Sequence, residues 1–176
     1  MAAQLPTPAL TGRECSLRRW EFSDADALRQ ACGDLDICRF TSVPMSFTVT
    51  AAREWIARQH AHATEGTAVV LATVLPEEGT PVGMVGLFGL DQPDCTARLG
   101  YWVIASHRGR GIATSAARML TDWAFAHLQL TTIYIDREPL NRASARLADK
   151  LGAVPTGSRS GSLDGRRIEF VRHSMS

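Results

Sequence analysis

A glycine- and arginine-rich segment carries the residues of this chain whose types and spacing best suit chemistry. Residues 107–113 read His-Arg-Gly-Arg-Gly-Ile-Ala and join an apolar run to a helical repeat. Glycine lets a backbone approach a ligand closely, and the first N–H groups of a helix have no partner within the helix. Those groups and the helix dipole favour a phosphate or pyrophosphate, and Arg108 and Arg110 add positive charge. The alternative is a flexible basic turn whose glycines serve only its geometry.

Two common nucleotide-binding loops do not fit this segment. The Walker A pattern contains a Gly-Lys pair, and the chain has none. The dinucleotide fingerprint G-x-G-x-x-G, started at Gly109 and Gly111, requires a third glycine where Thr114 stands. That fingerprint also opens a parallel βαβ unit, whereas several strand-like segments come before residue 107. Both of these nucleotide loops are excluded, and an unrelated binder of phosphate ligands stays open.

The composition is that of one globular domain spanning residues 1–176. Of the 176 residues 45% are hydrophobic and 21% are charged, which excludes disorder and fibrous repeats. The formal charge of +1 gives no global attraction to nucleic acid or to an anionic membrane. Apolar runs such as 68–75 are too short to span a bilayer, and residues 1–11 do not resemble a secretory signal. We therefore expect a single α/β domain that acts in the cytoplasm.

The cysteines indicate neither a metal site nor a disulfide framework. No two of them form a C-x-x-C pair, and no spacing fits a structural zinc site. We expect reduced thiols in or near the core, and no bound metal. The cysteines are Cys15, Cys32, Cys38 and Cys95.

Hydrophobic periodicity predicts alternating strands and helices around the candidate loop. Strands are expected at 14–20, 67–75, 81–90, 96–104, 131–136 and 159–171, the last as a strand or a hairpin turning at Asp164-Gly165. Helices are expected at 24–32, 34–40, 51–62, 111–127 and 141–150. The expected capping residues are Ser23 (with Asp26), Thr50 and Asn141 at helix starts, and Gly66 and Gly152 at helix ends.

Three blocks of residues together resemble the GCN5-related N-acetyltransferase (GNAT) superfamily over nearly the whole chain. Residues 108–113 fit the acetyl-CoA motif of that family, [RQ]-x-x-G-x-[GA]. A second cofactor-side motif is matched by Asn141-Arg142-Ala143-Ser144 followed by Lys150-Leu151-Gly152. The flanking blocks resemble the branch that acetylates the N-termini of ribosomal proteins (Rim type). Those blocks are Leu17-Arg18-Arg19-Trp20 with residues 23–28, Gly100-Tyr101-Trp102-Val103, and Ala113-Thr114-Ser115-Ala116.

The resemblance implies a central mixed, mostly antiparallel sheet of about seven strands flanked by helices, with acetyl-CoA as cosubstrate. In this family the strand before the loop carries a bulge and splays from its neighbour, and the pantetheine arm pairs with the freed backbone, here at 102–105. The pyrophosphate would rest on the amides of 108–113, and a backbone N–H near Val103 would stabilise the oxyanion as an amine attacks. The implied cofactor-binding residues are Trp102, Val103, Ile104, Arg108, Gly109, Arg110, Gly111, Ile112, Ala113, Asn141 and Ser144.

The resemblance also implies one catalytic residue, Ser144. Many family members donate to the leaving thiolate from a tyrosine on the last helix, where this chain has Ala148. Ser144 is the replacement expected in the Rim-type branch, with Asn141 binding the pantetheine arm. The alternative is that Asn141 only caps a helix and Ser144 only packs.

The general base stays unassigned. Many relatives carry glutamate just before the Gly-Tyr-Trp of the strand, and this chain has Arg98 there. The candidates are Asp91, Asp94, Asp136 and Glu138, and each has the alternative of a solvated loop charge.

The acceptor amine is open. A protein N-terminal α-amine is the default, a small-molecule amine (an antibiotic or a metabolite) is the rival, and a degenerate acyl-CoA-binding sensor is a third alternative. In this family residues 34–62 would line the acceptor groove, where Asp34 and Asp36 either attract a cationic amine or are solvated, and Phe40 and Trp55 either contact substrate or pack. We expect no nucleic-acid or membrane partner. Family sheets often pair across their last strands, so a homodimer is compatible with the resemblance.

Overall fold

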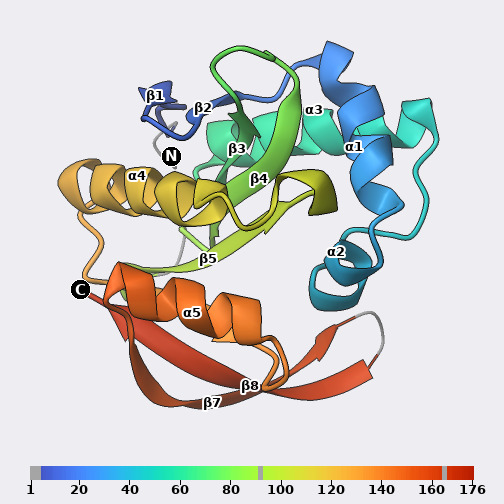
Figure 1. Cartoon of the computed structure of the whole chain (residues 1–176). Helices are drawn as coiled ribbons and strands as arrows, with labels where there is room; N and C mark the ends of the chain where they lie inside the picture. Colours follow the sequence, from blue (N-terminus) through green and yellow to red (C-terminus); the bar gives the residue numbers. More distant parts are fainter. Residues whose placement is uncertain (1–4, 91–92, 164–165) are drawn as a thin grey trace.

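The computed structural model describes residues 5–90, 93–163 and 166–176, which form one eight-stranded sheet (Figure 1). The strand order is β1-β2-β3-β4-β5-β6-β8-β7. Neighbouring strands are antiparallel except β5 and β6, which are parallel. This mixed, mostly antiparallel sheet confirms the predicted fold class. The strands are β1 (Leu10–Thr11), β2 (Ser16–Arg19), β3 (Ala68–Val74), β4 (Pro81–Phe88), β5 (Thr96–Val103), β6 (Thr132–Arg137), β7 (Val154–Leu163) and β8 (Arg166–Met175).

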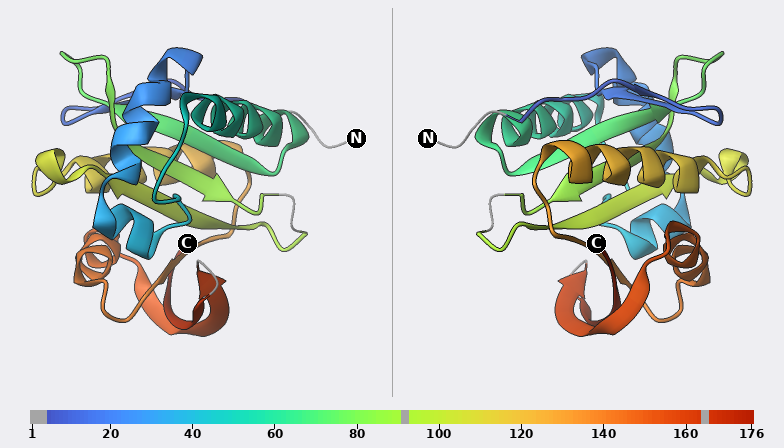
Figure 2. Two further views of the ribbon diagram at one scale, coloured as in Figure 1. Left: turned by 90° about the vertical axis from the view of Figure 1, so that its right-hand side faces the viewer. Right: turned by 90° about the vertical axis from the view of Figure 1, so that its left-hand side faces the viewer.

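Helices cover both faces of the sheet. In Figure 1 α4 and α5 lie in front of the strands and α3 lies behind them, and the side views of Figure 2 show the same separation. The α-helices are α1 (Ala25–Cys32), α2 (Leu35–Phe40), α3 (Val49–Glu65), α4 (Ile112–His127) and α5 (Arg142–Leu151). Two short 3₁₀ turns, η1 (Phe22–Asp24) and η2 (Ala105–His107), precede α1 and the candidate loop.

The sheet opens between β5 and β6. Their parallel ladder covers only Thr96–Arg98 against Thr132–Tyr134. Beyond Arg98 β5 continues to Val103 beside β4 alone. The splay implied by the family resemblance is therefore present. The bulge is not, because the β4–β5 register runs without a shift from Gly83↔Val103 to Phe88↔Arg98.

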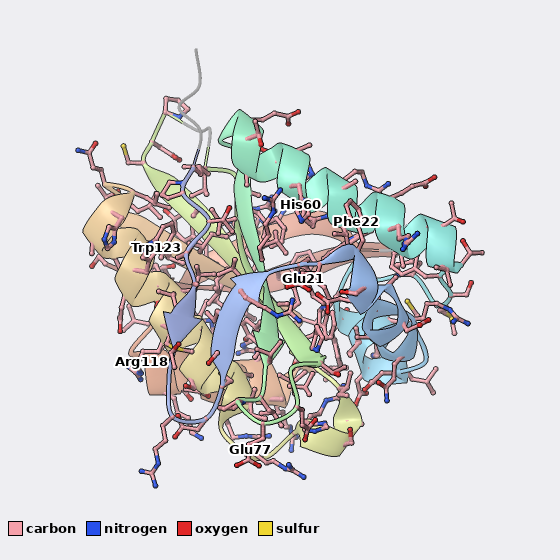
Figure 3. The ribbon with its side chains drawn as sticks, turned by 90° about the horizontal axis from the view of Figure 1, so that it is seen from above. Glu21, Phe22, His60, Glu77, Arg118 and Trp123 are labelled. Atoms are coloured by element: carbon pink, nitrogen blue, oxygen red, sulfur yellow. The ribbon has the colours of Figure 1, made fainter. Side chains whose placement is uncertain are left out.

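Aromatic rings fill the core on the α3 face of the sheet. Trp20 packs edge-on against Trp55 with ring centroids 5.5 Å apart, and it lies 6.3 Å from Trp102. Figure 3 shows Phe22 and His60 near one another at the entry to α1, where their ring centroids are 5.7 Å apart. These contacts support the packing interpretation of Trp55.

Two predicted helix caps differ from those in the structure. Before α1 the capping box forms at the turn η1, where Asp24 accepts the N–H of Glu21 at 2.8 Å and is held by Arg18. Ser23 with Asp26 does not form the box. Because Arg18 fixes Asp24, the chain enters α1 through the turn η1. Helix α3 is capped by Thr48, whose Oγ1 accepts the N–H of Ala51 at 3.0 Å, and not by Thr50.

Helix ends and strands agree more closely with the pattern. Gly66 and Gly152 end α3 and α5 in the left-handed conformation, with φ of 77° and 78°. Strand β1 was not predicted, because two residues carry no periodicity. The C-terminal hairpin is longer than expected, and its predicted turn at Asp164-Gly165 lies outside the described residues.

The four cysteines are free thiols. Cys15 and Cys32 are buried and Cys38 is half-buried, as expected. Cys95 is exposed, contrary to the prediction, because it lies in the turn before β5 with a φ of 54°.

Candidate active site

A cavity of about 390 Å³ lies where β5, the loop after η2, α2 and the start of α5 meet. It is lined by most of the predicted site residues: Trp102, Val103, Arg108, Gly109, Gly111, Ile112, Ala113, Asn141 and Ser144. Arg110 and Ile104 do not line it. Arg110 is exposed beside the loop, and Ile104 is buried with its N–H bound to Val82 O at 3.0 Å. Ile104 therefore has no free N–H for a ligand, and its part in cofactor binding stays a prediction.

The loop at the start of α4 has the backbone that an anion site needs. Gly109 and Gly111 have φ of 77° and 79°, a left-handed conformation that side chains oppose, and Gly111 is the residue just before α4. Within the described part of the chain, no protein acceptor is recorded for the N–H groups of residues 109–113. The helix dipole adds positive potential at the same place. This loop fits the pyrophosphate of acetyl-CoA.

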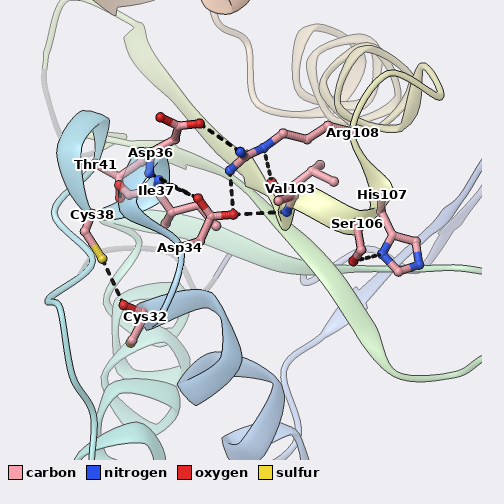
Figure 4. A network of polar contacts seen from close by, with 11 residues as sticks. Cys32, Asp34, Asp36, Ile37, Cys38, Thr41, Val103, Ser106, His107 and Arg108 are labelled. Carbon is pink, nitrogen blue, oxygen red and sulfur yellow. Dashed lines mark hydrogen bonds and ion pairs between the residues drawn. The ribbon is translucent and has the colours of Figure 1, made fainter.

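Arg108 does not face this loop as a free cation. Its Nη2 lies 2.7 Å from Asp34 Oδ2, its Nη1 lies 3.0 Å from Asp36 Oδ2, and its Nε donates to Val103 O at 2.9 Å (Figure 4). The guanidinium thus fastens α2 to the end of β5, and two carboxylates compensate its charge. This pairing argues against the predicted role of Arg108 in adding positive charge for a phosphate. The same role stays a prediction for exposed Arg110.

Asp34 is the centre of this polar network. It caps α2 by accepting the N–H groups of Asp36 and Ile37, and its other oxygen accepts the N–H of Ala105 at 3.0 Å. Burial by itself would raise the pKa of Asp34, but the hydrogen bonds from Arg108 and the Ile37 N–H outweigh it and hold the pKa below its ordinary value. Asp34 is therefore an ionised structural anchor rather than a free attractant for an amine.

These contacts leave fewer free backbone groups at residues 102–105, where the resemblance places the pantetheine arm. Because Ile104 N–H faces β4, strand alternation turns the N–H and C=O of Val103 toward the opening between β5 and β6. In this structure Val103 O and Ala105 N–H already have partners in Arg108 and Asp34. The Val103 N–H also faces the opening, and it is the group predicted to stabilise the oxyanion.

Ser144 and Asn141 lie on the opposite wall of the cavity. Asn141 caps α5, its Oδ1 accepting the N–H of Ser144 at 3.0 Å, so the capping part of its predicted behaviour is confirmed. Ser144 is buried, and its Oγ lies 2.6 Å from the phenol oxygen of Tyr101 on β5. Sequence reasoning did not single out Tyr101. Its only signal was a hydroxyl in an apolar strand, within the block 100–103.

The candidate bases have unequal surroundings. Asp136 is held by Arg172, with N–O distances of 2.7 and 2.9 Å, and by Arg159 at 2.8 Å. Burial would raise the pKa of Asp136, but these arginines outweigh it and lower the pKa, which makes Asp136 a poor base. Asp94 is exposed and accepts both the N–H and the hydroxyl of Thr96 in the turn before β5.

The two remaining candidates are Glu138 and Asp91. Glu138 is buried and directly follows β6. Asp91 lies outside the described residues. Arg98 is exposed on β5.

The class of this protein follows from the fold and from a family match. The family model "Acetyltransferase (GNAT) domain" matches residues 15–154. The chain therefore belongs to the GNAT acetyltransferase family, as its motifs indicated, and is an acetyltransferase that uses acetyl-CoA. The uncharacterized N-acetyltransferase p20 of Bacillus licheniformis is 30% identical over 142 residues, which cover 81% of this chain and 80% of that protein.

Solved structures share the fold at lower identity. The ribosomal L7/L12 alpha-N-protein acetyltransferase RimL, in complex with coenzyme A, superposes with a TM-score of 0.85 at 16% identity, covering 96% of this chain and 97% of that one. The microcin C7 self-immunity acetyltransferase MccE, in complex with acetyl-CoA and AMP, gives a TM-score of 0.84 at 19% identity over 96% and 97% of the two chains. Among the described residues of this chain, no helix is long and apolar enough to cross a membrane.

Proposed function

We propose that this chain transfers the acetyl group of acetyl-CoA to a protein N-terminal α-amine by direct attack of the amine on the thioester. The observation that carries the proposal is a single cavity that joins the N–H groups of the loop before α4 to the buried hydroxyl of Ser144. Acetyl transfer needs both groups, since the loop N–H groups bind the anionic donor and the Ser144 hydroxyl donates to the sulfur that leaves. The name of RimL, which shares the fold, supports the choice of acceptor.

The rim of the cavity also supports a polypeptide acceptor. Leu140 lines the cavity and is 73% exposed. Exposed large apolar side chains beside a cavity are typical of surfaces that a partner covers. An acceptor that enters as an extended chain end would cover the Leu140 side chain, whereas a small amine would leave it in water.

The chain's own residues would act in three ways. Loop residues 109–113 hold the donor through backbone N–H groups, which fixes the thioester relative to the amine. The Val103 N–H donates to the carbonyl oxygen as negative charge develops on it. Ser144 donates to the sulfur as the C–S bond breaks. Two of the other groups at this site, Arg108 and Asp34, pair with one another and position α2.

Acceptor-dependent release of CoA from acetyl-CoA tests the proposal. The panel contains N-terminal peptides, free amino acids and amine-bearing antibiotics, and mass spectrometry locates the acetyl group on each product. We expect release with peptides and acetylation at their α-amine. Release with free amino acids or antibiotics alone would contradict the protein acceptor and establish the small-molecule alternative.

Two alternatives are favoured by particular observations. MccE shares the fold and is described with AMP, which supports a small-molecule amine as acceptor. The pairing of Asp136 with two arginines leaves one base candidate fewer, which supports an acyl-CoA-binding sensor without turnover. A sensor would be stabilised by acetyl-CoA and release no CoA with any acceptor. The cytoplasmic location and the homodimer stay predictions.

A further inference from the structure

A hydroxyl pair bridges the open seam of the sheet. Tyr101 Oη on β5 and Ser144 Oγ on α5 lie 2.6 Å apart, although the residues are 43 positions apart in the chain. Both side chains line the cavity. The pair lies beyond Arg98, where the β5–β6 ladder has ended, so it stands beside the opening into which the donor's thioester must fit.

The chemistry of the two hydroxyls decides which one donates. A phenol is far more acidic than an alkyl hydroxyl, so Tyr101 is the better donor and Ser144 Oγ the acceptor. Burial raises the pKa of Tyr101 to about 12, although Ser144 and the charge of Arg137 act to lower it. The phenol therefore stays protonated at neutral pH and continues to donate.

Ser144 is fixed at both of its polar groups. Its N–H donates to Asn141 Oδ1 at 3.0 Å, which holds the first turn of α5. Among the described residues, Tyr101 is the one recorded partner of its hydroxyl. A hydroxyl has one hydrogen, so a serine that accepts from Tyr101 keeps that hydrogen for a second partner.

We propose that Tyr101 is a positioning residue for acetyl transfer: its phenol donates to Ser144 Oγ and directs the serine O–H toward the sulfur that leaves. The inference rests on the proposed function and deepens it. Ala148 lies one turn after Ser144 on α5, and it stands where the family resemblance places a tyrosine. In this chain the phenol comes from β5 instead and acts through Ser144.

The pair works by hydrogen bonding and not by net proton transfer. The amine nitrogen forms a C–N bond, the C–S bond breaks, and its electron pair stays on sulfur as a thiolate. Ser144 donates to that thiolate and Tyr101 donates to Ser144, and both protons stay on their oxygens. The proton that finally neutralises the sulfur is the one that the amine gives up.

The pKa of the thiol of bound CoA tests this without any acceptor. The ultraviolet absorbance of the thiolate reports that pKa in a pH titration, and steady-state kinetics give kcat and KM separately. Four variants are compared with the wild type: Tyr101→Phe, Ser144→Ala, the double variant, and Tyr134→Phe. Tyr101→Phe removes one oxygen and keeps the ring, and thermal unfolding verifies that it folds. Tyr134, on β6, is the matched control, since its ring lies under the guanidinium of Arg172 and does not line the cavity.

We expect the wild type to lower the thiol pKa of bound CoA below that of free CoA. Tyr101→Phe should raise it by about half a unit and lower kcat about fivefold, with KM for acetyl-CoA unchanged within about twofold. Ser144→Ala should have the larger effect, and the double variant should match it, because Tyr101 acts through Ser144. Tyr134→Phe should behave as the wild type.

Each contrary result has its own meaning. A wild-type thiol pKa equal to that of free CoA, or a Tyr101→Phe value equal to the wild-type value, overturns the inference. A double variant in which the two effects add also overturns it. A protein that binds CoA with a Tyr101-dependent thiol pKa but acetylates no amine supports the inference and refutes the proposed function. A protein that does not bind CoA refutes both.

Discussion

The carboxylate of Asp34 connects α2 to the loop that follows β5, and replacing it with asparagine isolates the contribution of its charge. Asparagine caps helices as well as aspartate does, so the hydrogen bonds to the N–H groups of Asp36 and Ile37 should persist. The other oxygen becomes an amide nitrogen, which faces two donors, the N–H of Ala105 and Nη2 of Arg108. Asp34→Asn therefore loses two hydrogen bonds, one of them to a charged group.

The size of this loss can be worked from the contacts. A hydrogen bond to a charged group contributes about 1.5–3 kcal/mol and a neutral one about 0.5–1.5 kcal/mol. The Arg108 side chain is 36% exposed, so water replaces part of what it loses. We expect Asp34→Asn to lower the free energy of unfolding by about 2 kcal/mol. Asp36 is 67% exposed and makes one contact with the same arginine, so Asp36→Asn should cost about 0.5 kcal/mol or less.

The pH dependence gives a second, independent signature. The pKa of Asp34 is lowered in the folded protein, so its charge contributes stability above the pKa of an unfolded aspartate, about 4, and loses that contribution as the pH falls through the folded value. The difference in stability between wild type and Asp34→Asn should be constant above about pH 5 and shrink below about pH 4.

Urea denaturation followed by tryptophan fluorescence measures these differences. The three proteins are compared at neutral pH and at a series of acidic pH values. The reasoning is refuted if Asp34→Asn is as stable as Asp36→Asn, or if the difference does not shrink on acidification.

Three further predictions concern other parts of the site. Gly111→Ala should lower the free energy of unfolding by about 1 kcal/mol and weaken CoA binding; a new Cβ meets nothing within 4 Å, so the cost is backbone strain at a φ of 79°. Gly33→Ala, at a φ of −79°, should be nearly neutral. Urea denaturation and CoA titration compare the two variants. Three basic residues recur every four positions on α5 and line the cavity: Arg142, Arg146 and Lys150. Arg146→Glu should weaken the binding of CoA about tenfold at low salt and the binding of dephospho-CoA less, whereas Arg53→Glu on α3 should weaken neither. Equal losses for both ligands would count against a role of Arg146 in phosphate binding. Asp136→Asn should destabilise the protein by about 2–3 kcal/mol, since it removes the charge that Arg159 and Arg172 share and leaves one accepting oxygen for the two of them. The pH profile of kcat should keep its shape, and a shifted profile would restore Asp136 as a base.

Local patterns in the sequence predicted the parts of the site that neighbouring residues create. The glycines before α4, the cap at Asn141 and the stop at Gly152 each depend on a few consecutive residues, and each was found from them. The pairs that cross the fold were missed. Arg108 and Asp34 are 74 positions apart in the chain, and no periodicity in the sequence predicts that their charges will pair.

The displaced cap before α1 has the same cause. The capping box joins Glu21 and Asp24, and Arg18 on the preceding strand holds the Asp24 carboxylate. Tyr101 was missed for the same reason, because the motif block 100–103 does not indicate which side chain of α5 faces it. Side-chain partners brought together by tertiary structure decide such positions, and a single sequence does not encode them locally.

The short ladder between β5 and β6 has a consequence for how the molecule unfolds. Backbone pairing joins strands β1–β5 into one block and β6–β8 into another, and among the described residues three backbone pairs join the two blocks along the sheet. Cooperativity between parts of a protein depends on the contacts that cross their boundary, so this boundary is where the sheet should open first under stress. A ligand bound at this boundary contacts both blocks and acts as a non-covalent cross-link. With the ligand bound, the amide hydrogens of the two blocks should exchange with solvent in one cooperative opening.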